Sequence, residues 1–155
     1  MLFDLFYDTV IAERRFLFSH AGVTKTWLSN IYASGESIDD KLTWLKEHFN
    51  EFRKDLTRTA IWEHLFRIGE ERGGRDDSGS IIWADFFEHV DNKNWIDDNI
   101  IQIVGHTQLN SHPGRIDNRL YCLDCRESFY VNNKGVIRSW PTDEDIMTKY
   151  TILEK

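Results

Sequence analysis

Two runs of apolar residues, each ending beside a histidine and a glycine, constrain the fold of this chain more than any other feature. Phe16-Leu17-Phe18 leads into Ser19-His20-Ala21-Gly22-Val23, and the apolar residues 100–104 lead into Gly105-His106-Thr107-Gln108. Short apolar runs rich in β-branched and aromatic residues indicate buried strands, and glycine lets the chain turn sharply where a strand ends. Both histidines are therefore predicted at strand ends, where a fixed backbone presents a metal ligand well. A hydrogen-bonded structural role is the alternative for each histidine.

These two motifs resemble the fourth and fifth motifs of the calcineurin-like metallophosphoesterases, a superfamily that includes serine/threonine phosphatases and dinucleotide tetraphosphatases. The family pattern runs D-x-H, G-D-x-x-D, G-N-H-[DE], H-[AG]-G and G-H. The segments 79–85 and 120–126 also resemble the corresponding positions of a bacterial branch of the family. The resemblance covers nearly the whole chain, and it implies a metal-dependent phosphatase, a hydrolase that acts on phosphoesters.

The resemblance also implies a set of site residues. In the family, two divalent ions (Mn, Fe or Zn) activate water for attack on phosphorus. His20 and His106 would bind one and the same ion. Asp124 would orient a metal ligand, Asp85 would line the cleft, and Arg126 would meet a phosphate group. A solvated strand end for Asp124, and surface positions for Asp85 and Arg126, are the alternatives.

Three motifs of the family are missing from the sequence. D-x-H, G-D-x-x-D and G-N-H occur nowhere in the 155 residues, and in the family they supply most of the metal ligands and the catalytic histidine. We therefore expect the chain to be the C-terminal half of a phosphoesterase domain, with at most a partial metal site and no activity alone. The alternative is a truncated, non-catalytic relative that acts as a protein-interaction module. In both cases, self-association through the exposed half-domain interface is expected.

Length and composition fit a single domain over residues 1–155 with a real core. The net charge of −7, from 19 basic and 26 acidic residues, argues against a nucleic-acid backbone as partner. No apolar run approaches the ~20 residues of a membrane span, and no signal-peptide pattern opens the chain, so we expect no membrane association and a cytoplasmic location. Cys122 and Cys125 are interpreted as buried structural thiols, ahead of a redox or zinc site.

The expected fold class is α/β (α+β): part of the two-sheet metallophosphoesterase sandwich flanked by helices, with a helical insert at about residues 37–72. Ser37 and Asp40 form a capping-box pattern ahead of an apolar helix stripe from Ile38 to Leu56, and further helices are predicted over residues 24–32 and 60–71. The tail after Pro141 is predicted to be peripheral. Strands are predicted over residues 15–19, 81–83, 100–104, 119–124, 128–131 and 136–138, with a hairpin turn at residues 132–135.

Overall fold

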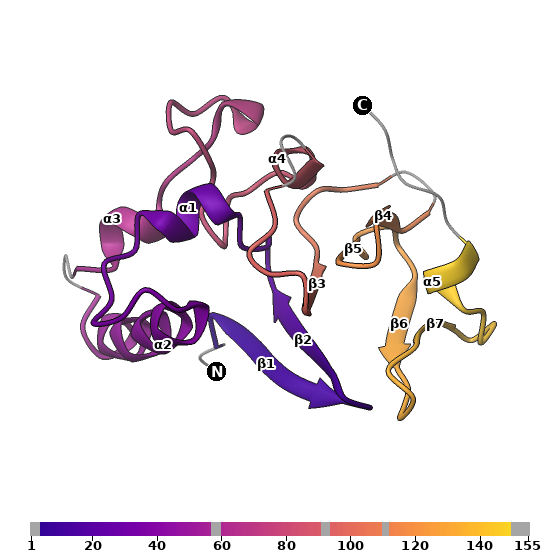
Figure 1. The fold of residues 1–155 in the computed structure, drawn as a ribbon. Helices are drawn as coiled ribbons and strands as arrows, with labels where there is room; N and C mark the ends of the chain where they lie inside the picture. Colours follow the sequence, from indigo (N-terminus) through magenta and orange to yellow (C-terminus); the bar gives the residue numbers. More distant parts are fainter. Residues whose placement is uncertain (1–3, 57–59, 91–93, 110–111, 150–155) are drawn as a thin grey trace.

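The computed structural model describes residues 4–56, 60–90, 94–109 and 112–149. Within these residues, strands form a five-stranded sheet with the order β1-β2-β3-β5-β4 and a two-stranded sheet of β6 and β7 (Figure 1). The chain is thus a mixed α and β protein, as expected. The strands are β1 (Phe6–Ile11), β2 (Arg14–Ser19), β3 (Ile100–Val104), β4 (Gly114–Ile116), β5 (Leu120–Cys122), β6 (Ser128–Val131) and β7 (Ile137–Trp140). The helices are α1 (Lys25–Ser29), α2 (Ile38–Lys54), α3 (Trp62–Leu65), α4 (Phe86–Val90) and α5 (Ile146–Lys149), with a 3-10 turn over Glu70–Arg72.

β1 and β2 form an antiparallel hairpin in which Phe6 lies opposite Ser19. The turn between them consists of Ala12 and Glu13, which have φ angles of 50° and 65°. This left-handed conformation matches the twist of the two strands in a two-residue hairpin turn. β1 was not predicted, because the polar residues Asp8 and Thr9 in its middle break up the apolar run.

The centre of the sheet is parallel. β2 pairs in parallel with β3, where Phe18 lies opposite Ile103, and β3 pairs in parallel with β5, where Val104 lies opposite Cys122. Because parallel strands point the same way, the carboxyl ends of these three strands meet at one edge of the sheet. β4 is antiparallel to β5 and closes the far side of the sheet.

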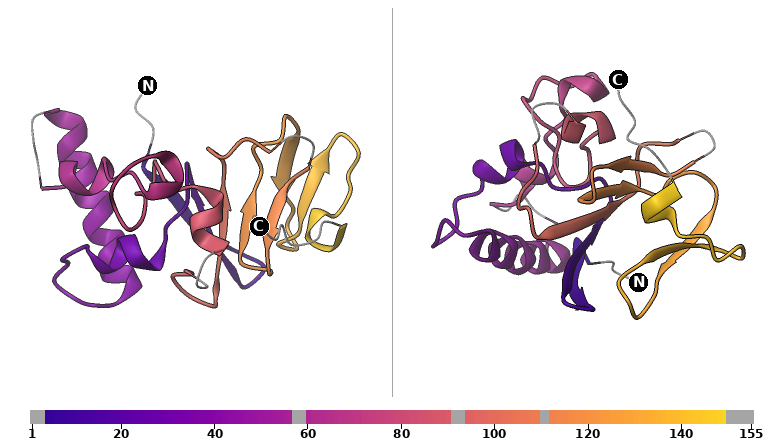
Figure 2. Two further views of the ribbon diagram at one scale, coloured as in Figure 1. Left: turned by 90° about the horizontal axis from the view of Figure 1, so that it is seen from above. Right: turned by 45° about the vertical axis from the view of Figure 1, so that its right-hand side comes forward.

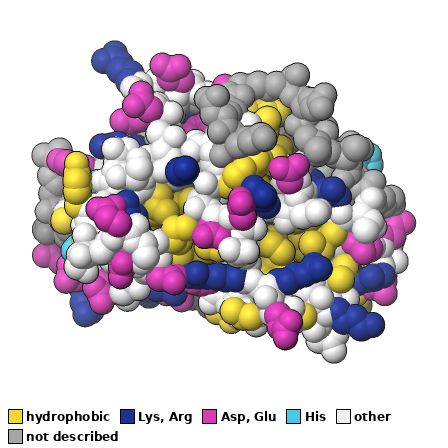
Figure 3. Space-filling model, in the orientation of Figure 1, with side chains coloured by type: hydrophobic (Ala, Val, Ile, Leu, Met, Phe, Trp, Pro, Cys, Tyr) yellow, Lys and Arg dark blue, Asp and Glu magenta, His cyan; other side chains and the backbone are white. Residues whose placement is uncertain are grey.

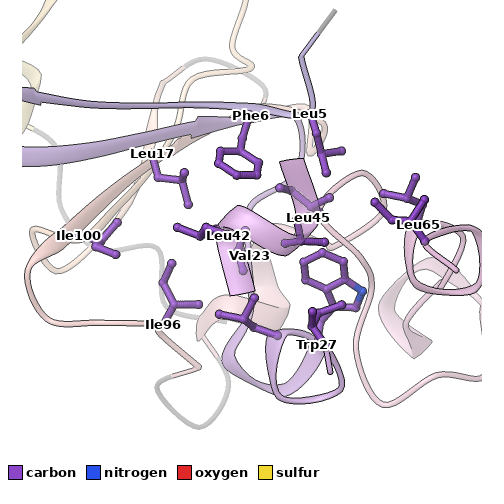
Figure 4. Close-up of a cluster of buried hydrophobic side chains, with 14 residues drawn as sticks. Leu5, Phe6, Leu17, Val23, Trp27, Leu42, Leu45, Leu65, Ile96 and Ile100 are labelled. Carbon is purple, nitrogen blue, oxygen red and sulfur yellow. The ribbon is translucent and has the colours of Figure 1, made fainter. Parts of the chain in front are cut away.

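The elements are arranged in three layers. Seen from above in Figure 2 (left), α2 and α3 lie at one side, β6 and β7 lie at the other, and the five-stranded sheet lies between them. The first core cluster fills the space between the helices and the sheet. In Figure 4, Leu42 and Leu45 of α2 lie beneath Phe6 and Leu17 of the sheet, with Trp27 below them. The second core cluster lies between the two sheets and contains Phe16, Ile103, Tyr121, Ile137 and Ile146.

Helix α2 begins as predicted. The Ser37 hydroxyl accepts a hydrogen bond from Asp40 N at 3.1 Å, and the Asp40 carboxylate accepts one from Ser37 N at 3.2 Å. This is a capping box, which satisfies two backbone N–H groups that the first turn of the helix leaves free. The helix ends at Lys54, close to the predicted end of its apolar stripe.

The second predicted helix, over residues 60–71, is wrong in extent, because only α3 and the 3-10 turn are helical. The carbonyl oxygens that would continue the helix are bonded elsewhere: Ser80 Oγ donates to Leu65 O at 2.6 Å and Ser80 N donates to Arg67 O at 3.0 Å. The predicted strand over residues 81–83 is also wrong. Trp83 N and Ala84 N both donate to Ser80 O, so this segment is a turn.

Besides β1, three elements were not predicted at all, namely α4, β4 and α5. The prediction of a peripheral tail is wrong at α5, because Ile146 is 1% exposed and belongs to the second core cluster. The strands predicted over 100–104 and 128–131 are present with the same bounds, as β3 and β6. The others have shifted ends: the strand over 15–19 is β2, the helix over 24–32 is α1, the strand over 119–124 is β5, and the strand over 136–138 is β7.

Among the described residues, no helix is long and apolar enough to cross a membrane. The face of the molecule in Figure 3 carries Lys and Arg side chains interspersed with Asp and Glu, and hydrophobic side chains are visible between them.

The burial assigned to the first core cluster can be tested by the same Leu→Ala substitution at a buried position and at an exposed one. Leu45 of α2 is fully buried, whereas Leu56, just after that helix, is 70% exposed. We expect Leu45→Ala to lower the free energy of unfolding by about 3 kcal/mol, because it removes buried methyl groups and leaves a cavity. Leu56→Ala should change it by less than about 0.5 kcal/mol. Urea unfolding measures both, and equal losses would contradict the assigned burial.

Candidate metal-binding site at the histidine pair

His20 and His106 lie side by side at the carboxyl edge of the parallel strands. His20 follows β2 directly, and His106 follows β3 after Gly105. The parallel pairing of β2 with β3 brings together two residues that are 86 positions apart in sequence. Nε2 of His20 lies 2.8 Å from Nδ1 of His106, so one imidazole donates a hydrogen bond to the other, and the ring centroids are 4.7 Å apart.

The turn that carries His20 is tied to β3 at two levels. Gly105 N donates to His20 O at 2.9 Å. Three residues after His20, Val23 is held by the side-chain amide of Gln102 in β3, which accepts from Val23 N at 2.8 Å and donates to Val23 O at 2.9 Å. This pairing satisfies both backbone groups of a buried residue and fixes the turn against the strand. The backbone position of His20 is therefore set by β3, the strand that also leads to His106.

A buried histidine supports the same turn from beneath. His89 of α4 is fully buried, and its Nε2 lies 3.2 Å from Ala21 O. Because a carbonyl oxygen only accepts, Nε2 must carry the proton, and Nδ1 has no partner among the described residues. Burial lowers the pKa of His89 to about 4, although the contact with Ala21 O and the charge of Asp85 favour the protonated form. His89 is therefore neutral near pH 7.

Gly22 makes the close approach of His89 possible. Its φ is +93°, in the left-handed region that glycine adopts without strain, and a Cβ atom at this position would lie 2.6 Å from His89 Nε2. Position 22 thus requires glycine for two physical reasons: its positive φ and the close approach of His89.

His106 occupies a strained turn. Its φ is +68°, and Thr107 N donates to Gly105 O at 2.8 Å across it. A three-residue turn with a positive φ at its centre is the rare form of the γ-turn, and for a residue with a side chain it is unfavourable. Strain of this kind persists only where the surrounding structure enforces it, and it is concentrated at functional sites.

A network of side chains holds this turn in place. Arg72 donates through Nη2 to His106 O at 3.3 Å and to Thr107 Oγ1 at 3.0 Å, and its Nε lies 2.9 Å from the Asp85 carboxylate. Thr107 Oγ1 donates to that same carboxylate at 3.3 Å. From the other side, the Cys122 thiol contacts the carbonyl oxygens of Gly105 and Thr107 at 3.6 and 3.3 Å.

The surroundings of His106 favour its neutral form. Burial lowers the pKa of this imidazole, and the positive charges of Arg72 and His20 lower it further, while Asp85 and Asp124 act in the opposite direction. Its Nε2 is buried without a hydrogen-bond partner among the described residues. In a neutral imidazole one nitrogen carries the proton and a metal ion binds the other, which at this pair would be Nδ1, the atom that lies next to His20.

The three other site residues suggested by the sequence lie near the pair but differ in their surroundings. Asp124 follows β5, is half-buried, and its Cβ lies 3.9 Å from the position that a Cβ on Gly105 would take. Arg126 is exposed and lines a cavity of about 120 Å³ together with Asp124. Asp85 is buried, with its carboxylate held by Arg72, and it does not occupy the surface position offered as its alternative.

The geometry suits two of the ligands of a metal ion but not a complete site. Two nitrogens bound at 2.0–2.1 Å would be ~2.9 Å apart at a right angle and ~3.3 Å apart in a tetrahedral arrangement. The observed 2.8 Å is close to the first value. Within the described ranges, no group of three or more His, Cys, Asp or Glu side chains is placed to hold a metal ion. The residues present therefore fit one half of a coordination sphere.

Sequence reasoning missed the residues that position the pair: Arg72, His89, Gln102 and Thr107. One weak signal was available, because Gln102 is the only polar residue inside the apolar run of β3. Both cysteines are buried, as predicted, and neither forms a disulfide. Burial raises the pKa of the Cys122 thiol to about 11.

No family model matches the chain, and neither the curated proteins nor the solved structures give a significant match.

Alanine substitutions at two glycines separate the effect of the close contact with His89 on stability from the effect of backbone strain. Gly22 and Gly73 both have a positive φ, but a Cβ at Gly73 would meet nothing within 4 Å. We expect Gly73→Ala to lower the free energy of unfolding by about 1 kcal/mol through strain alone. Gly22→Ala should lower it by about 3 kcal/mol or more, because a steric clash with His89 is added. Urea titration measures both variants, and equal losses would show that the clash contributes nothing.

The buried neutral state of His89 makes stability depend on pH. The folded form binds its proton only near pH 4, whereas the unfolded form binds it near 6.5. The free energy of unfolding is therefore at its full value above about pH 6.5 and is lost as the pH falls through this window, by about 3 kcal/mol once pH 4 is passed. His89→Gln keeps an N–H donor and cannot titrate, so its stability should fall less over the same window. Urea titrations at several pH values compare the two proteins, and parallel curves would contradict the assignment.

Proposed function

We propose that this chain supplies one half of the centre of a metal-dependent phosphoesterase, with His20 and His106 as two ligands of one divalent ion. The observation that carries the proposal is the pair itself. Two imidazole nitrogens lie 2.8 Å apart at the carboxyl edge of parallel strands, which is where ligands bind in open sheets of this kind. They stand in the two motifs that resemble the metal-binding motifs of calcineurin-like metallophosphoesterases.

The residues of the chain have defined tasks in this proposal. His20 and His106 bind as neutral imidazoles, and the lowered pKa of His106 keeps it in that form at neutral pH. Arg72 and Asp85 hold the strained turn so that Nδ1 of His106 stays directed at His20. Asp124 adds negative charge next to the pair, which favours a bound cation. When bound, a pair of divalent ions supplies an activated water and holds the charge that develops on the phosphoryl oxygens.

The remaining ligands and the catalytic histidine would come from residues outside this chain, either an upstream part of the same polypeptide or a second chain. The three missing motifs support this part of the proposal. It also gives a role to the two-stranded sheet of β6 and β7, which would be part of the second sheet of a complete sandwich. The substrate of the completed centre is a phosphoester.

Metal binding tests the role of the pair directly. We expect Mn²⁺ to broaden the NMR signals of the His20 and His106 rings before those of the exposed His112. His20→Ala and His106→Ala should each weaken binding about tenfold or more, because each removes one of two ligands. His112→Ala is the matched control and should leave binding unchanged. Uniform broadening of all histidines, or equal affinities for all variants, would rule out the pair as a metal site.

Activity gives a second test. We expect the chain alone not to hydrolyse an aryl phosphate in the presence of Mn²⁺, because two protein ligands are fewer than the three or four that hold a catalytic ion. Colourimetric release of the aryl alcohol measures this, with a complete metal-dependent phosphatase as positive control. Mn²⁺-dependent turnover that is lost in His106→Ala would show that the site is complete within this chain.

A second candidate function is that of a non-catalytic interaction module. It is favoured by large hydrophobic side chains exposed near the start of the sheet and just after α3, such as Tyr7 at 62% and Phe66 at 43%. Self-association would be its simplest form. Sedimentation equilibrium distinguishes the two functions when combined with the metal titration, because a module that acts only by association has no need of His20 or His106.

A further inference from the structure

A large cavity in the described part of the chain has His20 in its wall. It has a volume of about 660 Å³ and lies between the start of β1, the end of β2, the second half of α2 and α3. This volume is within the range of sites that bind small organic molecules. Since His20 also belongs to the histidine pair, the cavity adjoins the proposed metal site.

Aromatic rings dominate the walls of this cavity. Tyr7 and Phe18 lie on paired strands with ring centroids 6.1 Å apart, and Phe49 and Phe52 of α2 have centroids 6.2 Å apart. Phe66 completes the set from just beyond α3. Rings at these separations offer both faces and edges to a planar aromatic group. The walls therefore favour an aromatic ligand over a flexible alkyl chain.

The polar groups of the cavity are few. Asp4 is the only carboxylate among the lining residues, and Arg53 balances its charge at a distance of 2.9 Å. Apart from the Tyr7 hydroxyl, the other polar side chains among the described lining residues are His20 and Ser19, and both lie at the end of β2, where the histidine pair is located. The cavity thus has an apolar body and one polar end.

We propose that this cavity binds the aromatic group of a phosphoester whose phosphoryl group lies at the histidine pair. Only the position of the phosphoryl group rests on the proposed function. The aromatic walls would bind an aromatic group with or without a metal ion. The proposed substrate class is phosphomonoesters of aromatic alcohols. Tyr7 and Phe66 are the binding residues that solvent reaches most easily.

Non-hydrolysable probes test the proposal on the chain as it is. Benzylphosphonate carries both groups, benzyl alcohol only the ring, methylphosphonate only the anion, and hexylphosphonate an alkyl chain in place of the ring. Saturation-transfer NMR detects contact with the ring protons, and titration gives the affinities. We expect benzylphosphonate and benzyl alcohol to bind, methylphosphonate to bind weakly or not at all, and hexylphosphonate to bind less tightly than benzylphosphonate.

Two variants locate the binding. Tyr7→Ala and Phe66→Ala should each weaken benzylphosphonate about fivefold, which corresponds to one lost aromatic contact. Tyr32→Ala is the matched control, since Tyr32 is 85% exposed and does not line the cavity. Thermal melting of all three variants shows that they are folded. Unchanged affinity in both cavity variants would overturn the proposal.

Titrations with and without Mn²⁺ test the aromatic site and the proposed metal site separately. If Mn²⁺ tightens benzylphosphonate but not benzyl alcohol, and His106→Ala removes that gain, both proposals stand. If the ring probes bind equally with and without Mn²⁺, the aromatic site stands and the metal site fails. If no probe binds, or hexylphosphonate binds as tightly as benzylphosphonate, the aromatic site is overturned whatever the metal does.

Discussion

The parallel pairing of β2 with β3 is the constraint on which the candidate site depends. It places Phe18 opposite Ile103, so the two strands end at the same edge of the sheet. The residues that follow the two strands must therefore lie side by side. A shift of this register by one residue would turn the apolar side chains of a strand to the wrong face of the sheet. The two core clusters on either side of the sheet therefore fix the register, and the register fixes the distance between His20 and His106.

A strand pairing alone does not direct two imidazoles toward each other. Each histidine lies in a turn that is held in place by its own set of contacts. The turn after β2 is held by the Gln102 amide and lies over His89, where only glycine fits. The turn after β3 is strained at His106 and is enforced by Arg72 and Cys122. A strained backbone lowers stability unless it serves another purpose. That it coincides with the histidine pair is the strongest indication that the pair is functional.

The elements and residues that depend on local sequence patterns were predicted correctly. Those that depend on tertiary contacts were not. The apolar runs gave β2 and β3, the capping box gave the start of α2, and the histidine motifs gave both members of the pair. The apolar residues 81–83 resemble a strand, but Ser80 O accepts the hydrogen bonds that fold them into a turn. β1 has a polar centre and is stabilised by its partner strand, partly through the Asp8–Arg15 ion pair. Arg72 and Asp85 are 13 positions apart, and no sequence pattern relates them.

The uneven size of the two sheets connects the candidate site with the aromatic cavity. Two strands cover one face of a sheet that has five, and Tyr7 and Phe18 lie in paired positions on β1 and β2 at the end where the histidines are. Apolar surface left open on a sheet favours an occupant, because its burial is favourable at roughly 25 cal/mol for each Å² removed from water. A metal ion held by the two imidazoles, as proposed, would lack further ligands at the same place. Both deficits would be met by a single molecule or segment that brings apolar groups and oxygen ligands together, and a phosphoester with an aromatic group is one such molecule.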